Sequence, residues 1–317
     1  GKTTYLNHLM KSNPDTRYAI IENEYGEQSI DSELIIRGED DIVELNNGCL
    51  CCTLNDNLYD ILNTLFERRA EYDEIVIEAT GVANPAGLAE PFVAHSAIKK
   101  QFPLKGIICL VDAEQIEQQL EATKEAMEQV TFSDVLLINK TDLVASDTLD
   151  ALQDKLKRLN PLARILTKTT EGFPEVHHAT YSVAFEETLQ KTHGLRQLSN
   201  STQTFPVHQP HHHHHHHEHT EVVSHTIIID QAFDKQKLYH QLLVYLTFQA
   251  ADLYRMKGLV WIANEEEQFV IQSVGKRLDL EQKSPWKPHE EKRSTLVFIG
   301  KGIQRAGLEK LLKKCLH

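Results

Sequence analysis

The sequence predicts an α/β protein with a mostly parallel sheet, followed by a small α+β domain. Two observations predict this. Short apolar segments alternate with helical patterns up to about residue 170, which is typical of a parallel sheet. A stretch rich in Ser, Thr, Gln, Pro and His then interrupts the pattern before strands and helices resume. We therefore expect a first domain at residues 1–190, a His-rich linker at 191–224 and a C-terminal domain at 225–317.

In the first domain, short apolar runs predict strands at Tyr18–Ile21, Ile42–Leu45, Glu74–Ile77, Gly106–Val111, Val135–Ile138 and Arg164–Leu166. Between them, apolar residues at helical spacing predict helices over Leu58 to Phe66, about Glu114 to Met127, and Thr148 to Leu159. The C-terminal domain has strand candidates at His225–Ile229, Leu259–Ala263, Phe269–Val274 and Thr295–Ile299, and helices marked by Leu238 to Leu246 and Leu308 to Cys315. Open α/β sheets bind ligands at the carboxyl ends of their strands, so the residues that follow each strand are the site candidates.

The charge balance disfavours some classes of partner. Lys and Arg together number 33 against 46 Asp and Glu, a formal net charge of −13. A nucleic-acid backbone requires a basic surface instead. No apolar run approaches the roughly 20 residues of a membrane span. We therefore expect neither a nucleic acid nor a membrane among the partners.

The cysteines indicate a reducing compartment. The chain has five, and three of them fall within residues 49–52, which is too few and too clustered for the disulfide framework of a secreted protein. Cys51 and Cys52 are adjacent, and a disulfide between them would be strained. We expect reduced thiols in a cytoplasmic protein, with Cys109 in an apolar strand and Cys315 on an apolar helix face as core residues.

The chain opens with Gly1-Lys2-Thr3-Thr4, the last part of a phosphate-binding loop of the form G-x-x-x-x-G-K-[ST]. In such a loop Lys2 neutralises the β and γ phosphates and the Thr3 hydroxyl ligates Mg²⁺. The helix that begins there points its N-terminal amides at the phosphates. Because the first residue is Gly rather than Met and stands inside the motif, we expect a fragment or a processed form whose preceding strand and glycines lie upstream.

A second motif, Asn139-Lys140-Thr141-Asp142, follows the strand candidate Val135–Ile138. Asp142 can accept hydrogen bonds from guanine N1–H and N2–H₂. Adenine lacks this donor pair and would leave a buried Asp142 unpaired, at a cost of roughly 1–3 kcal/mol. Lys140 can lay its alkyl stem over the base, and Asn139 can tie this loop to the phosphate loop. Coming after Gly1–Thr4, the motif predicts GTP and GDP as ligands rather than a solvated turn at a strand end.

The segment Glu78-Ala79-Thr80-Gly81 ends another strand candidate. Glu78 can hold Mg²⁺ through water or orient an attacking water, and Gly81 can offer its amide to the γ-phosphate. Together with Lys2, these two are the candidate catalytic residues. Asn84-Pro85 is also a helix-start signal, and both interpretations can hold.

Cys49-Leu50-Cys51-Cys52 is a candidate metal site. Thiolates bind Zn²⁺, Co²⁺ and Ni²⁺, and tetrahedral sulfur-rich sites suit zinc. The three thiolates converge only if the segment bends, which Gly48 allows. Three protein ligands would leave a fourth position open to exchange, as a carrier needs. The alternative is that the thiols are buried and pack as small apolar residues.

A run of seven histidines lies in the expected linker: His211, His212, His213, His214, His215, His216 and His217. Imidazoles bind zinc, nickel and copper, so this run can buffer metal ions in weak, exchangeable sites. An expression tag and a solvated low-complexity spacer are the alternatives. The internal position argues against a tag.

Taken together, the motifs resemble the CobW-type family of metallochaperone GTPases. The resembling segments are GKTT (1–4), IENEYGE (21–27), NNGCLCC (46–52), IEATGVANP (77–85) and NKTD (139–142), in the order and spacing of that family. The segments RMKGLVWI (255–262) and STLVFIG (294–300) resemble its smaller C-terminal domain. The resemblance implies a P-loop GTPase domain that hydrolyses GTP with Mg²⁺ and delivers a transition metal to a client metalloprotein. Zinc is the preferred metal, with cobalt and nickel as alternatives.

The resemblance also implies that residues 22–27 act as a switch. We hypothesise that this segment senses the γ-phosphate and moves the cysteine loop, so that nucleotide state changes metal affinity. Two other functions stay open at this point. One is a metal buffer or sensor with a vestigial nucleotide site. The other is a regulatory GTPase that acts through protein contacts and has structural cysteines. A homodimer is compatible with the sequence, which does not fix the oligomeric state.

Overall fold

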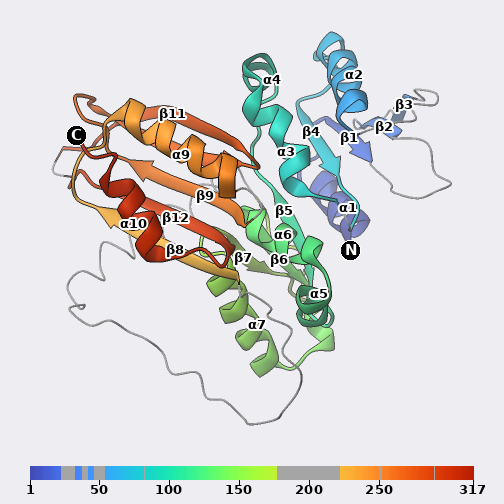
Figure 1. Cartoon of the computed structure of the whole chain (residues 1–317). Helices are drawn as coiled ribbons and strands as arrows, with labels where there is room; N and C mark the ends of the chain where they lie inside the picture. Colours follow the sequence, from blue (N-terminus) through green and yellow to red (C-terminus); the bar gives the residue numbers. More distant parts are fainter. Residues whose placement is uncertain are drawn as a thin grey trace. The chain divides into compact units, whose positions relative to one another are not determined.

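The computed structural model describes residues 1–22, 33–37, 42–45, 54–81, 83–176, 222–249, 252–288 and 290–317. The chain divides into two compact units (Figure 1). The first comprises Gly1–Leu152 and Ile165–His177, and the second comprises Gln153–Arg164 and His178–His317.

The first unit contains two sheets, one with strand order β3-β2-β1-β4 and one with order β5-β6-β7. Its strands are β1 (Tyr18–Glu22), β2 (Glu33–Arg37), β3 (Ile42–Leu45), β4 (Glu74–Glu78), β5 (Ile108–Asp112), β6 (Val135–Asn139) and β7 (Arg164–Thr167). Its helices are α1 (Lys2–Ser12), α2 (Leu54–Glu67), α3 (Pro85–Ala94), α4 (Ser96–Gln101), α5 (Ile116–Ala122), α6 (Lys124–Phe132), the 3₁₀ helix η1 (Thr141–Leu143) and α7 (Ser146–Leu159), whose C-terminal part belongs to the second unit.

Strand direction fixes which loops meet at one edge of the first sheet. β1 and β4 are parallel, β2 is antiparallel to β1, and β3 is antiparallel to β2. β1, β3 and β4 therefore run in the same direction and end at the same edge. β5 and β6 are likewise parallel, with Asp112 beside Asn139. The predicted parallel strands are present, and β2 is a strand that the sequence pattern did not predict.

The side chains of β1 alternate between two hydrophobic clusters. Tyr18 and Ile20 pack with residues of α1, whereas Ala19 and Ile21 pack with residues of α2 and α3. Successive side chains of a strand point to opposite faces, so helices cover this part of the sheet on both sides. This layering is the α/β architecture that the sequence predicts.

Helix α1 also contacts the second sheet of the first unit. Its Tyr5 packs with Leu137 of β6 and meets the ring of Phe173 edge-on, with ring centroids 5.3 Å apart. One helix therefore bridges both sheets, and its first turn carries the Gly1–Thr4 motif.

Tyr5 provides a test of polar burial in this core. Among the described residues its buried hydroxyl has no hydrogen-bond partner. Burial, with a smaller contribution from Tyr18, raises the pKa of Tyr5 from 10.0 to about 12. Tyr5→Phe is expected to stabilise the fold by about 1 kcal/mol at pH 7, because an unpaired buried hydroxyl is costly. The unfolded phenol ionises first, so the native protein loses stability as the pH rises from 10.0 through about 12. Between pH 7 and about pH 11, urea unfolding should show that Tyr5→Phe loses less free energy of unfolding than the unaltered protein. A Tyr5→Phe variant that is less stable than the unaltered protein at pH 7 would contradict the assignment.

The helix predicted over about Glu114 to Met127 is in fact two helices. Thr123 breaks it in an extended conformation, and its Oγ1 accepts a hydrogen bond from Ala126 N at 3.3 Å, which caps α6. The helix start predicted at Asn84-Pro85 is confirmed. The Asn84 Oδ1 accepts hydrogen bonds from Ala86 N at 2.9 Å and Gly87 N at 3.2 Å.

The second unit is an antiparallel sheet with strand order β11-β10-β9-β12-β8. Its elements are β8 (Val222–Ile229), α9 (Lys235–Gln249), β9 (Leu253–Val260), β10 (Glu267–Val274), β11 (Arg277–Pro285), β12 (Ser294–Lys301) and α10 (Arg305–Lys313). Both helices lie on one face of the sheet (Figure 1). β11 was not predicted. The strand expected at Leu259–Ala263 starts and ends earlier, because the chain turns at Asn264, which has a φ of +63°.

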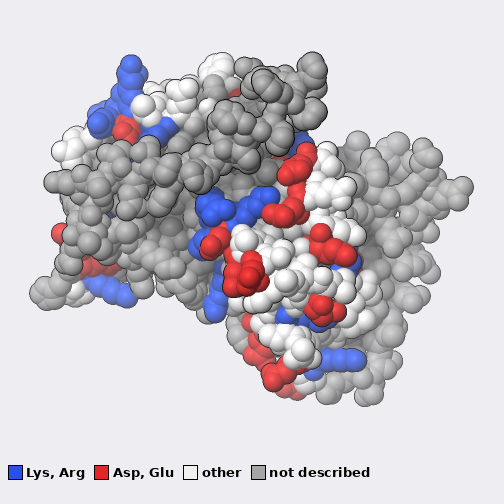
Figure 2. Space-filling model, turned by 90° about the horizontal axis from the view of Figure 1, so that it is seen from below, with Lys and Arg blue, Asp and Glu red and all other residues white. Residues whose placement is uncertain are grey.

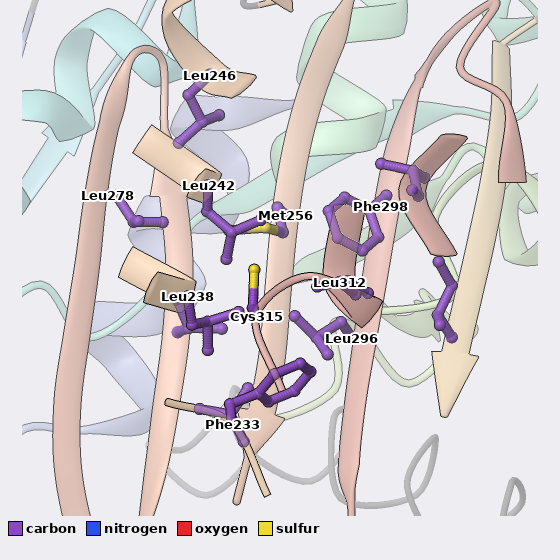
Figure 3. Packing of buried hydrophobic residues seen from close by; sticks show 14 of the residues in the cluster. Phe233, Leu238, Leu242, Leu246, Met256, Leu278, Leu296, Phe298, Leu312 and Cys315 are labelled. Atoms are coloured by element: carbon purple, nitrogen blue, oxygen red, sulfur yellow. The ribbon is translucent and has the colours of Figure 1, made fainter. Parts of the chain in front are cut away.

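Figure 3 shows the core of the second unit, where leucines of α9 meet the sheet. Leu242 is fully buried there. Leu242→Ala should destabilise this unit by about 3 kcal/mol, through lost burial and the cavity that remains. Val244→Ala on the same helix is the control, since Val244 is 39% exposed. Chemical denaturation of both variants would contradict this packing if their midpoints shifted equally.

The surface of the described residues is mixed in charge on the face drawn in Figure 2. Lys and Arg side chains there lie interspersed with Asp and Glu. Within the described ranges, we find no helix with the length and apolar character needed to span a bilayer.

Candidate functional site

The first turn of α1 exposes the Gly1–Thr4 motif. Gly1 is the N-cap residue, and its carbonyl accepts a hydrogen bond from Tyr5 N at 3.0 Å. Lys2, Thr3 and Thr4 follow in the first turn, all exposed, and no acidic residue lies in that turn. An N-terminal helix turn with a lysine and two hydroxyls attracts anions, because its first amides have no partner within the helix.

The end of β4 faces the same helix. Val76 packs in the cluster of α1, whereas Ile75 and Ile77 pack in the cluster of α2. By strand alternation Glu78 lies on the α1 face, and it stands beside Glu22 of β1 in the register. The sheet therefore places the predicted carboxylate on the side that carries the threonines of the first turn of α1.

The loop after β4 forms a braced turn. Ala83 N donates to Thr80 O at 3.1 Å. The Gln129 Nε2 of α6 donates to Gly81 O at 3.0 Å and to Ala83 O at 3.0 Å. Gln129 was missed in the sequence, where a polar residue on a helix gives no signal of such a contact.

Nothing in the described part of the structure requires a glycine at position 81. A Cβ built there meets no atom within 4 Å, and Gly81 is not among the glycines with positive φ. A glycine also serves where a ligand approaches the backbone closely. This position at the end of β4 is where the sequence predicts a γ-phosphate contact.

The predicted base-reading motif forms an ion pair with an aspartate from the neighbouring strand. Lys140 has a left-handed backbone, with φ +58° and ψ +35°. Its Nζ lies 2.6 Å from Asp112 Oδ2, and the other oxygen of Asp112 accepts a hydrogen bond from Glu114 N at 3.1 Å. The hydrogen bond to Asp112 raises the pKa of Lys140. A residue other than glycine at positive φ is uncommon and often marks a functional position.

Thr141 of this motif is anchored to Lys168, the residue that follows β7. Thr141 Oγ1 donates to Lys168 O at 3.0 Å, and Lys168 N donates to Ile138 O at 2.8 Å. Asp142, the residue predicted to bind guanine, is exposed in η1. The Oδ1 of Asn139 is buried and has no partner among the described residues.

Asp112 was also missed in the sequence. It is the last residue of β5, and the register sets it beside Asn139. The available signal was its position, since a carboxylate that ends an apolar strand lies at the ligand-binding edge of a parallel sheet.

The predicted transition-metal ligands Cys49, Cys51, Cys52 and His211–His217 lie outside the described residues, as do the predicted switch residues 23–27. The predicted Mg²⁺ ligand Thr3 is described, in the first turn of α1. In the part of the chain that is described, no group of three or more His, Cys, Asp and Glu is arranged to hold a metal ion.

Of the two other cysteines, Cys315 is packed in the core as predicted, whereas Cys109 is only partly buried. Cys315 is fully buried, and Figure 3 shows its sulfur pointing into the core of the second unit. Burial raises the pKa of the Cys109 thiol to about 12 and that of Cys315 to about 11. Both are poor metal ligands, because metals bind the thiolate.

The structure describes the residues on either side of the cysteine segment, which itself lies outside the described residues. β3 ends at Leu45 and α2 begins at Leu54. In the register Leu45 pairs with Leu34, which pairs with Ile21, which pairs with Ile77. The segment therefore leaves the sheet from the same row of residues that precedes Glu22 and Glu78.

Comparison with known families accounts for both units. The model of the CobW/HypB/UreG nucleotide-binding domain matches residues 1–167, and that of the cobalamin synthesis protein CobW C-terminal domain matches residues 222–316. The chain belongs to the CobW family. The predicted P-loop GTPase domain with a C-terminal α+β domain is thereby confirmed.

Relatives of this CobW-family chain include proteins linked to zinc. Zinc chaperone YjiA of Escherichia coli (strain K12) is 32% identical over 308 residues, which cover 95% of this chain and 90% of YjiA. The zinc-regulated GTPase metalloprotein activator 1 of Schizosaccharomyces pombe is 34% identical over 179 residues, covering 54% of this chain and 43% of that protein. The crystal structure of Zn(II)-bound YjiA GTPase from E. coli superposes with a TM-score of 0.68 at 27% identity, covering 100% of this chain and 95% of that one.

Proposed function

We propose that this CobW-family protein hydrolyses GTP and uses the nucleotide cycle to deliver zinc to a client metalloprotein. The observation that supports this best is the strand register of the first sheet. It brings the start of the cysteine segment to the edge where β1 and β4 end. Zinc-linked relatives support the choice of metal, and cobalt or nickel remain the alternatives.

The distances along that edge are short. Leu45 and Ile77 are separated by three strand spacings, about 14 Å. Cys49 is four residues beyond Leu45 and so can reach at most about 14 Å from it. Cys52 precedes the first residue of α2 by two positions. A metal in the cysteine loop would therefore lie within reach of the residues that follow Glu22 and Glu78.

The nucleotide phosphates fit the first turn of α1. Lys2 would neutralise the β and γ phosphates, and the exposed amides of the turn would bind phosphate oxygens. Hydroxyl and carboxylate oxygens are the ligands that Mg²⁺ takes alongside phosphates, and Thr3 and Glu78 provide that set on the α1 side of the sheet. When bound, Mg²⁺ neutralises the charge that develops on the transferred phosphoryl group. Glu78 would also orient the attacking water, while the Gly81 amide binds the γ-phosphate.

Guanine recognition falls to the end of β6. Asp142 would accept hydrogen bonds from guanine N1–H and N2–H₂. The stem of Lys140 would cover the base, and Asp112 holds its ammonium group to one side. The buried Oδ1 of Asn139 would accept a hydrogen bond from the phosphate loop.

Zinc would pass from weak binding sites to one tight site whose affinity depends on the nucleotide. Histidines 211–217 would buffer zinc in exchangeable sites, and Cys49, Cys51 and Cys52 would hold one ion in the reducing cytoplasm, with a fourth position open to the client. Residues 22–27 would sense the γ-phosphate, so that GTP and GDP favour different geometries of the cysteine loop. Nucleotide and metal affinities must then be linked reciprocally.

Zinc titration of the full-length protein tests this coupling. It is done with guanosine 5′-(β,γ-imido)triphosphate, a non-hydrolysable GTP analogue called GTP-γ-imide below, with GDP, and without nucleotide. We expect zinc affinities that differ at least fivefold between the triphosphate and diphosphate states, within the usual range of coupling free energies. A parallel assay should show GTP turnover that changes with zinc.

The other outcomes separate the alternatives. Zinc bound equally in all three states, with no GTP turnover, would indicate a metal buffer with a vestigial nucleotide site. GTP turnover that is independent of zinc and of the cysteines would indicate a GTPase that acts only through protein contacts. Either result would overturn the proposal.

A further inference from the structure

We propose that Gln129 is a positioning residue that sets the direction of the Gly81 amide and thereby lets the protein distinguish GTP from GDP. This inference rests on the proposed function of the same site. Gln129 comes from α6, 48 residues further along the chain than Gly81. It would touch neither nucleotide nor metal, and would act entirely through the turn that follows β4.

Glycine makes this turn hard to preorganise. Without a Cβ, Gly81 has the widest range of backbone angles of any residue, and a Cβ there would meet no described atom within 4 Å. Packing therefore does little to hold it. An amide that must meet a phosphate oxygen is most effective when its direction is fixed before the ligand arrives.

Hydrogen bonds fix both peptide groups that flank the Gly81 Cα. The peptide between Thr80 and Gly81 is held because Thr80 O accepts a hydrogen bond from Ala83 N at 3.1 Å. In a planar trans peptide the N–H of Gly81 then points away from that carbonyl. The peptide after Gly81 is held because Gly81 O accepts from Gln129 Nε2 at 3.0 Å.

The second hydrogen bond of Gln129 closes the brace. The same Nε2 donates to Ala83 O at 3.0 Å, and an amide nitrogen has two N–H groups to give. Ala83 is therefore held at its carbonyl by Gln129 and at its amide by Thr80. The far end of the turn runs directly into Asn84, which caps α3.

Gln129 itself is on a rigid support. Its carbonyl accepts a hydrogen bond from Ser133 Oγ at 2.6 Å, and the next two residues, Val130 and Thr131, are fully buried. α6 packs against α3, the helix that follows the turn (Figure 1), and leads into β6 with its base-reading motif. The brace thus ties the predicted γ-phosphate contact to the element that precedes the guanine site.

The experiment compares Gln129→Leu, which removes both donors at similar volume, with Gln129→Lys, which keeps N–H donors. Gln119→Leu is the matched control, because Gln119 is exposed on α5. For each full-length variant, the affinities for GDP and for GTP-γ-imide are measured, together with kcat and the unfolding midpoint. Because the Gly81 amide meets only the γ-phosphate, we expect Gln129→Leu to weaken the triphosphate about tenfold, the value of one hydrogen bond to a charged group. GDP affinity should change less than twofold, kcat should fall, and Gln129→Lys should recover most of the loss.

Equal losses for GDP and the triphosphate would overturn the inference, because they would show a general structural role. Unchanged triphosphate affinity and kcat in Gln129→Leu would overturn it as well. Failure of the proposed function looks different, since the unaltered protein would then bind neither nucleotide or show no turnover. A protein that prefers the triphosphate and ignores Gln129→Leu would overturn only this inference.

Discussion

Replacing Asp142 with Asn should abolish guanine recognition and transfer the preference to xanthine nucleotides. The carboxylate can accept from both N1–H and N2–H₂ of guanine, whereas an Asn side chain offers one acceptor and one amino group. That amino group would oppose the guanine N2–H₂ but can donate to the carbonyl oxygen that xanthine has at the same position. Hydrogen bonds to a charged group contribute about 1.5–3 kcal/mol each, so GDP affinity should fall about 100-fold or more.

The change should leave the fold intact. Asp142 is exposed, and the surrounding loop is held by the hydrogen bonds of Thr141 Oγ1 to Lys168 O and of Leu143 N to Lys140 O. Asp150→Asn is the matched control, since Asp150 is exposed on α7. Titrations with GDP and XDP decide the matter. Unchanged GDP affinity in Asp142→Asn would remove the motif from the nucleotide site.

The sequence predicted those strands whose pattern is local. The parallel strands β1, β4 and β6 are apolar runs bounded by polar residues, so pattern and fold agree. β2 escaped prediction although its apolar part, Leu34 to Ile36, is as long as that of β4, Ile75 to Ile77. It is a strand through pairing with β1 on one side and β3 on the other. β11 escaped because it is a charged edge strand that pairs with β10 alone in its sheet.

The same distinction, between local sequence patterns and tertiary contacts, applies to the candidate site. Candidate residues that lie in contiguous motifs, such as Lys2-Thr3 or Lys140 with Asp142, were predicted from the sequence alone. Asp112 and Gln129 were not, because each acts across a long sequence separation on a backbone or an ammonium group. Their roles exist only after β5 is laid beside β6 and α6 beside α3. Tertiary contacts of this kind produce no fixed spacing in the sequence, so no sequence motif indicates them.

Replacing Cys49, Cys51 and Cys52 together with Ser should remove the tight zinc site. A serine hydroxyl stays protonated at neutral pH and is a poor ligand for zinc, whereas thiolates are strong ones. Site-forming zinc binding is worth on the order of 10 kcal/mol in small thiolate sites, so a loss of three ligands should weaken it at least about 1000-fold. Any zinc dependence of GTP turnover should disappear with it. The variant keeps two of the five cysteines, Cys109 and Cys315, whose burial raises their thiol pKa values and leaves them unsuited to replace the site.

A second variant, with Ser in place of all seven histidines from His211 to His217, separates the tight site from the weak store. It should keep one tightly bound zinc and its nucleotide dependence, and lose only the additional weak equivalents. The two variants therefore make opposite predictions for one titration, because thiolates bind zinc far more tightly than clustered imidazoles on a solvated segment. The variant with Ser at positions 49, 51 and 52 could instead keep a tightly bound zinc whose affinity still differs between GTP-γ-imide and GDP. The nucleotide-dependent zinc site would then not be formed by these cysteines. The register that brings Leu45 to the row of Ile21 and Ile77 would then serve the nucleotide alone.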